Sequence, residues 1–170
     1  MKNNLNPRAS GRARGGMPKL VLPPQYSRRI LYASSLTLCS IYSAACNERS
    51  INLRLACSVL ATSVLYWYHP VLGWRRNLDM LCTFGSLGYQ AVYTSFETTE
   101  RCRYAYWFTL LCGGSCYATG RYISKVYGNL NVSSMLHVGL HMWGNIGNCI
   151  LYDSFKVNAL GLGPTIPSLD

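Results

Sequence analysis

The sequence contains little charge for its length, and acidic residues are its scarcest charged type. Of the 170 residues, 16 are Lys or Arg and 6 are Asp or Glu, which makes 13% of the chain charged, against roughly 25% in an average protein. Five segments carry no charge at all, with lengths of 18, 20, 17, 17 and 27 residues: 30–47, 55–74, 80–96, 104–120 and 126–152. Because helices at the surface of soluble proteins carry a charged or polar face, this pattern disfavours an ordinary soluble enzyme, a coiled coil and a disordered chain.

The uncharged segments have about the length that a helix needs to cross a bilayer, which is ~17–25 residues. We therefore predict an all-α fold, a multi-pass transmembrane helical bundle with about five spans: 30–46, 52–69, 78–96, 104–120 and 133–152. The mean hydropathy of +0.08 is low for such a protein, because the spans contain many Ser, Thr, Gly, Cys and Tyr residues. Small residues of this kind let membrane helices pack closely. The alternative is a soluble domain whose helices are buried on all sides.

The first 29 residues contain no acidic residue and no apolar run, so they lack the core of a secretory signal. Seven Lys or Arg and seven Pro or Gly predict a flexible basic arm over 1–29, ahead of the bundle over 30–152 and a short C-terminal tail over 153–170. We interpret the arm as a cytoplasmic tail. The arm could instead be an organelle targeting segment, or its charge could bind anionic lipid or, less favourably, nucleic acid.

The distribution of Lys and Arg predicts an orientation in the membrane. With the N-terminus inside, the inside segments hold 11 of these residues and the outside segments hold 5. Positive charge accumulates on the cytoplasmic side of membrane proteins. We therefore expect an integral membrane protein with a cytoplasmic N-terminus, an outside C-terminus and membrane lipids as partners.

The eight cysteines include no Cys-x-x-Cys pair, so neither a zinc knuckle nor a thioredoxin-like site is indicated. Cys112 and Cys116 lie one helical turn apart and could share a ligand. Buried small side chains within a span are the favoured interpretation of both residues.

The three histidines and one aspartate form the candidate site. His137 and His141 have the i, i+4 spacing that stacks two side chains on one helix face. His69 ends the second predicted span and Asp79 begins the third, and both fall on the same membrane side as the start of the last span. Three histidines and a water suffice for catalytic zinc, and Asp79 could act as general base. Alternatively, Asp79 pairs with a neighbouring arginine and each histidine bonds separately to nearby helices.

This pattern resembles the CREST superfamily, which includes alkaline ceramidases and progestin/adipoQ receptors. The resemblance lies in His69, in Asp79 ten residues later, and in the His-x-x-x-His of His137 and His141. It implies a zinc ion held by the three histidines, with Asp79 assisting attack of water on a lipid amide. It also implies seven spans, where we count five.

The family carries a serine one turn before its first histidine, where this chain has Leu65. Ser63 is six residues before His69 and, at 100° per residue, points away from it. Ser134 or Ser86 could supply the missing donor to a transition-state oxyanion. Loss of such a donor typically costs ~2.7–4 kcal/mol, so the resemblance also allows a relative without catalysis, such as a receptor.

The last span has a polar stripe, formed at spacings of 4, 4 and 3 by His137, His141, Asn145 and Asn148, with Ser134 extending it. Such a stripe faces protein or water rather than lipid. It fits a metal site, and equally a packing face against a partner protein or a second copy of the chain. We therefore expect a structural or assembly role in a membrane, with a zinc-dependent hydrolase of a lipid amide or ester as the alternative.

Overall fold

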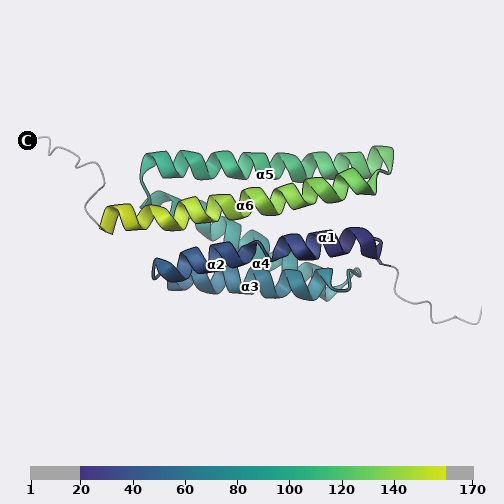
Figure 1. The fold of residues 1–170 in the computed structure, drawn as a ribbon, viewed down its shortest axis with the longest axis horizontal. Coiled ribbons are helices and arrows are strands. Elements are labelled where there is room, and N and C mark those ends of the chain that lie inside the picture. Colours follow the sequence, from purple (N-terminus) through teal and green to yellow (C-terminus); the bar gives the residue numbers. More distant parts are fainter. Residues whose placement is uncertain (1–19, 160–170) are drawn as a thin grey trace, which may run out of the picture.

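The computed structural model describes residues 20–159, and the side chains of residues 20–154. The helices follow one another along the chain (Figure 1): α1 (Pro24–Ser34), α2 (Thr37–Cys46), α3 (Ser50–Trp67), α4 (Trp74–Val92), the short 3-10 helix η1 (Thr94–Glu97), α5 (Glu100–Tyr127) and α6 (Leu130–Ala159). Apart from one isolated bridge between Leu20 and Val71, the described part of the chain has no β-structure. The prediction of an all-α fold is confirmed.

The first predicted helix differs from the observed structure in its start and in its continuity, and α5 extends beyond the predicted 104–120 at both ends. The first helix begins at Pro24, six residues earlier than predicted, because proline in the first turn of a helix sacrifices no backbone hydrogen bond. Residues 24–29 therefore belong to the bundle, not to the arm. The helix then breaks at Ser35 and Leu36, whose N–H groups bond three residues back at 3.1 Å in the manner of a 3-10 turn.

The outer boundaries of the predicted domains shift as well. Helix α6 continues to Ala159, so the first residues of the predicted C-terminal tail are helical. The arm over 1–19 and the end of the tail over 160–170 lie outside the described residues.

Helix α6 lies in the middle of the bundle (Figure 1). Helices α5 and α6 form a long antiparallel pair, and α1 and α2 run along the other side of α6 in the same direction as α6. Helix α3 returns beside α1 and α2, and α4 packs mainly against α3. One end of the bundle gathers the start of α1, the α3–α4 connection and the α5–α6 connection. There the Val21 N–H bonds to the Pro70 carbonyl at 2.8 Å.

Close approach of α5 and α6 depends on glycine. A Cβ at Gly120 would lie 3.3 Å from Leu136 Cβ, and a Cβ at Gly139 would lie 3.2 Å from Cys116 Sγ. A Cβ at Gly147 would collide with Thr109 Oγ1. The two long helices therefore pack backbone to backbone, as small residues allow.

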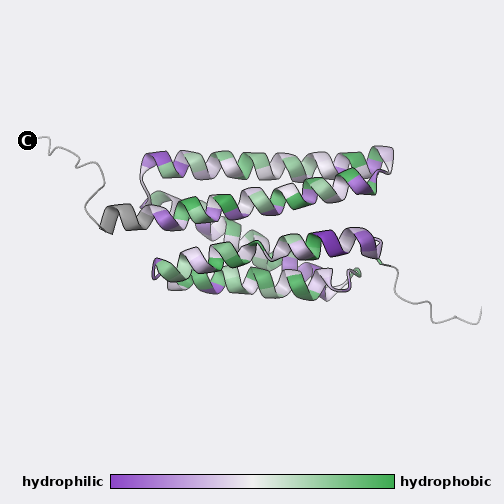
Figure 2. Cartoon of the chain, in the orientation of Figure 1, coloured by the Kyte–Doolittle hydropathy of each residue, from purple (hydrophilic) through white to green (hydrophobic). Residues whose placement is uncertain are grey.

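The interior of the bundle is unusually polar. Among the described residues, seventeen buried residues are polar or charged and nine are hydrophobic, while twenty-seven large hydrophobic residues are exposed. Figure 2 shows hydrophobic and pale, weakly polar residues alternating along the helices. Within residues 20–159, no single helix combines the length and the mean apolarity needed to cross a membrane.

Candidate functional site

The structure places His137 and His141 side by side on α6. Their ring centroids lie 5.3 Å apart, as the i, i+4 spacing predicts. The His137 ring is enclosed by two aromatic rings from other helices, with its centroid 5.2 Å from that of Trp67 on α3 and 6.1 Å from that of Tyr117 on α5. The histidine pair therefore lies at the junction of α3, α5 and α6.

His141 contains a buried nitrogen, Nε2, for which no hydrogen-bond partner is found among the described residues. A buried polar atom without a partner costs about 1–3 kcal/mol. The backbone of the same residue is engaged, because Asn145 Nδ2 donates to the His141 carbonyl at 2.8 Å. The unpaired imidazole nitrogen is the one feature of this site that is not explained by packing.

A small cavity of about 20 Å³ adjoins His137 between α5 and α6, lined also by Cys116, Tyr117, Gly120, Arg121 and Ser133. This volume is about that of one water molecule, which needs at least ~10–15 Å³. The cavity is too small for an organic substrate.

His69 is not grouped with His137 and His141 as a set of potential metal ligands. It follows the last residue of α3 by two positions, its side chain is exposed, and its N–H bonds to the Tyr66 carbonyl at 3.2 Å. Among the described residues, no group of three or more His, Cys, Asp or Glu side chains could hold a metal ion. The structure thus brings together two of the three zinc ligands implied by the family resemblance.

Asp79 is buried and bonded to the end of α3. Its Oδ1 accepts a hydrogen bond of 2.6 Å from Ser63 and a weaker one of 3.4 Å from Thr62. No ion pair joins it to Arg75 or Arg76 in the described part of the chain. The carboxylate therefore joins α3 to α4, and Ser63 is its main partner.

The two serines considered as oxyanion donors have other partners. Ser134 is buried, donates to the Asn131 carbonyl at 2.8 Å and accepts from Arg29 at 3.4 Å. Ser86 accepts from Gln90 at 3.3 Å. Ser134 thereby contacts α1, whereas the partner of Ser86 lies on the same helix α4. Among the described residues, neither serine bonds to Asp79 or a histidine.

The polar stripe on α6 packs within this chain. Asn145 Oδ1 accepts a buried hydrogen bond of 2.6 Å from Ser40 on α2. Farther along α6, the Tyr152 hydroxyl accepts from Gln90 Nε2 at 2.5 Å, and Tyr106 donates to Gln90 Oε1 at 3.5 Å. This network was not predicted from the sequence, although a glutamine inside an uncharged run is a signal for a buried polar contact.

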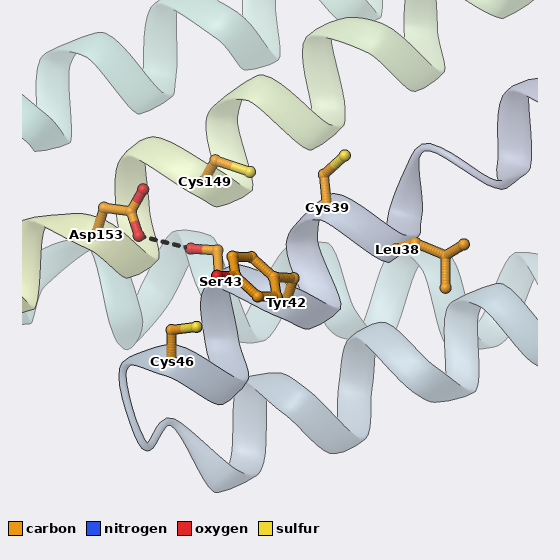
Figure 3. Close-up of a pocket in the computed structure, with 7 residues that line it drawn as sticks. All are labelled: Leu38, Cys39, Tyr42, Ser43, Cys46, Cys149 and Asp153. Atoms are coloured by element: carbon orange, nitrogen blue, oxygen red, sulfur yellow. Dashed lines mark hydrogen bonds between the residues drawn. The ribbon is translucent and has the colours of Figure 1, made fainter.

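An open groove of about 700 Å³ between α2 and α6 was also not predicted (Figure 3). Its lining residues are Leu38, Cys39, Tyr42, Ser43, Cys46, Cys149 and Asp153. Asp153 Oδ1 accepts hydrogen bonds of 2.9 Å from Ser43 and from Asn47. These bonds fix the position of α2 along α6.

Comparison of the chain with protein-family models, with curated proteins and with solved structures gives no significant match. The functional interpretation therefore depends on the distribution of side chains in the bundle and on the candidate site.

Proposed function

We propose that this chain is a small integral membrane protein, a multi-pass helical bundle with a structural or assembly role. The observation that carries the proposal is the inverted distribution of side chains, polar inside and apolar outside. A bundle in water buries its large apolar residues and exposes charge. Helices in lipid gain little from burying apolar surface against one another, and associate through small residues and hydrogen bonds.

The outward faces support lipid contact along the middle of the bundle. On α5, Phe108 and Leu111 are 60% and 70% exposed, and on α4 Leu81 and Phe84 are exposed to similar degrees. The interior Ser, Thr and Asn side chains lower the mean hydropathy of each helix, whereas only the outward face would meet acyl chains.

Exposed aromatic residues lie near both ends of α5, with Tyr104 close to the start and Tyr122 close to the end. They are separated by 18 residues, or roughly 27 Å of helix. The hydrocarbon core of a bilayer is ~30 Å thick, and tyrosine and tryptophan are enriched at both of its interfaces. The spacing of these two tyrosines on α5 therefore fits one tyrosine at each membrane interface.

Placing a charge on the outward face tests this proposal. Lysine for Leu111 at the middle of α5 would cost about 2.5–3.5 kcal/mol in lipid and almost nothing in water. We expect Leu111→Lys to lower the fraction of protein retained in membranes after alkaline carbonate washing. Tyr127→Lys, at the end of the same helix, is the matched control and should be retained like the parent. Release of the parent itself by carbonate, without detergent, would contradict the proposal.

A second candidate function, a zinc-dependent hydrolase of a lipid amide or ester, is favoured by one observation. The unpaired, buried Nε2 of His141 lies next to His137, and imidazole nitrogen is a preferred zinc ligand. In this candidate His69 completes the ligand set and Asp79 serves as base. Zinc would supply an activated water at the site.

A further inference from the structure

The topology of the bundle gathers six basic residues at one end. They come from the first turns of α1, the first turn of α4 and the last turns of α5: Arg28, Arg29, Arg75, Arg76, Arg121 and Lys125. We call this set the basic end. These residues are far apart in the sequence, but α1, α3 and α6 meet there, as the Val21–Pro70 hydrogen bond and the contact of Trp67 with His137 show.

Acidic residues are nearly absent from the described part of the basic end. Asp79 is the one acidic residue described there, and it is buried and bonded to Ser63. None of the six basic side chains forms an ion pair in the described part of the chain. Arg29 instead donates to Asn131 and Ser134 on α6, which holds its guanidinium at the α1–α6 junction.

The opposite end of the bundle is balanced. Its described side chains include four basic and four acidic residues: Glu48, Arg49, Arg54, Glu97, Glu100, Arg101, Arg103 and Asp153. Two ion pairs form among them, Arg49 with Glu97 and Arg103 with Glu100, each at 3.4 Å. The charge asymmetry therefore belongs to the folded bundle itself.

We propose that the basic end is a binding surface for the phosphate groups of anionic phospholipids. This inference rests on the proposed membrane location. Basic residues close to a membrane surface attract anionic headgroups, and arginine matches phosphate oxygens with two parallel N–H donors.

Lipid is favoured over nucleic acid by the surroundings of the basic end. Exposed aromatic side chains accompany the charges there: Tyr68, Trp74, Tyr122 and Tyr127. The apolar outward faces of α4 and α5 begin directly beyond them. An amphipathic ring beside a cation suits the boundary between headgroups and acyl chains, and the apolar faces would have no role against a nucleic acid.

The experiment uses the full chain reconstituted into vesicles of equimolar phosphatidylcholine and phosphatidylglycerol. Phospholipids that remain with the protein after mild detergent extraction are counted by mass spectrometry. We expect phosphatidylglycerol to be enriched several-fold over phosphatidylcholine. The enrichment should fall as the salt concentration rises, because exposed charges are screened within about 10 Å at 0.1 M salt.

Two matched double variants locate the binding surface. Arg121→Gln with Lys125→Gln removes two exposed charges from the basic end, and we expect at least half of the enrichment to be lost. Arg54→Gln with Arg101→Gln removes two exposed charges from the opposite end and should leave the enrichment unchanged. No enrichment in the parent, or equal loss in both variants, overturns the inference.

The outcomes also separate this inference from the proposed function. A parent that enters phosphatidylcholine vesicles but shows no enrichment overturns only the lipid-binding surface. A parent that enters neither kind of vesicle overturns both proposals. Binding of a single-stranded RNA oligonucleotide that weakens only in the Arg121→Gln/Lys125→Gln variant, without phosphatidylglycerol enrichment, would assign the basic end to nucleic acid instead.

Discussion

Ser63 donates a 2.6 Å hydrogen bond to Asp79 Oδ1 in the interior of the bundle, and so joins the last turns of α3 to the first turns of α4. Both side chains are buried. The geometry assigns Asp79 a structural contact that needs an acceptor oxygen rather than a negative charge. A structural contact and a general base predict different effects of substituting Asp79.

We expect Asp79→Asn to retain most of the stability of the parent, because the amide oxygen can still accept from Ser63. Asp79→Ala should lower the free energy of unfolding by about 1–3 kcal/mol, since it leaves the Ser63 hydroxyl buried without its acceptor. Thermal unfolding of the detergent-solubilised protein measures both. Ser63→Ala combined with Asp79→Ala should cost less than the sum of the two. A double variant whose loss of stability equals the sum of the two single losses would show that the Ser63–Asp79 hydrogen bond is not formed.

The positions of most helices could be predicted from the sequence, because each long uncharged run forms most of one helix. The exact ends could not, since α5 and α6 continue past charged residues to Tyr127 and Ala159. The break between α1 and α2 could not be predicted in this way. The run over 30–47 contains no proline or glycine, and the i→i+3 bonds at Ser35 and Leu36 have no local signal. Likewise, uncharged helices do not reveal which face is buried, so contacts such as Ser40 with Asn145 depend on the tertiary fold.

The sequence could predict only the part of the candidate site that lies within one helix. The i, i+4 spacing placed His137 and His141 on one face of α6, and the structure has them adjacent. The position of His69 relative to this pair depends on how the chain turns after Trp67. Since α3 ends there, the imidazole falls on an exposed connection, which no spacing rule describes.

Gly147 provides a test of the close packing of α5 against α6. A methyl group there would collide with Thr109 Oγ1 and lie 3.3 Å from the Tyr106 ring. We expect Gly147→Ala to lower the free energy of unfolding by about 1–3 kcal/mol, as overpacking of a tight interface does. Gly144→Ala is the control on the same helix, because nothing lies within 4 Å of its Cβ position. Equal tolerance of both substitutions would be evidence against the register in which the two helices pair.

Cys39 and Cys149 should form a disulfide bond when the protein is treated with an oxidant such as iodine. Ser43 and Asp153 are hydrogen-bonded at 2.9 Å, and each cysteine lies one turn earlier on the same two parallel helices. Figure 3 shows both thiols at the same groove. The two thiols would lose two protons and two electrons to iodine, which is reduced to iodide.

Mass spectrometry of the proteolysed protein would identify the linked peptides. The link should disappear in Cys39→Ser and persist in Cys57→Ser, which changes an exposed thiol on α3. A link from Cys149 to Cys46 in place of Cys39 in the parent would show that α2 has a different position along α6.

His141 distinguishes the structural role from the zinc site, because the two roles predict opposite changes in stability. In the structure its Nε2 is buried, with no partner among the described residues. Replacing it with an apolar side chain of similar volume removes an unpaired polar atom, so we expect His141→Leu to be neutral or to raise the free energy of unfolding by about 1–2 kcal/mol. Asn145→Leu on the same helix breaks the hydrogen bond with Ser40 and should lower the free energy of unfolding.

A zinc ligand would behave differently. Loss of a ligand also loses the free energy of metal binding, which contributes directly to folding. His141→Leu would then destabilise the protein, and elemental analysis would show about one zinc per chain in the parent and none in the variant. Because two imidazoles alone leave a zinc ion short of protein ligands, we expect the parent to hold far less than one zinc per chain even after zinc is supplied. A full equivalent would make turnover of a lipid amide the next measurement, with Asp79→Asn as the inactive control.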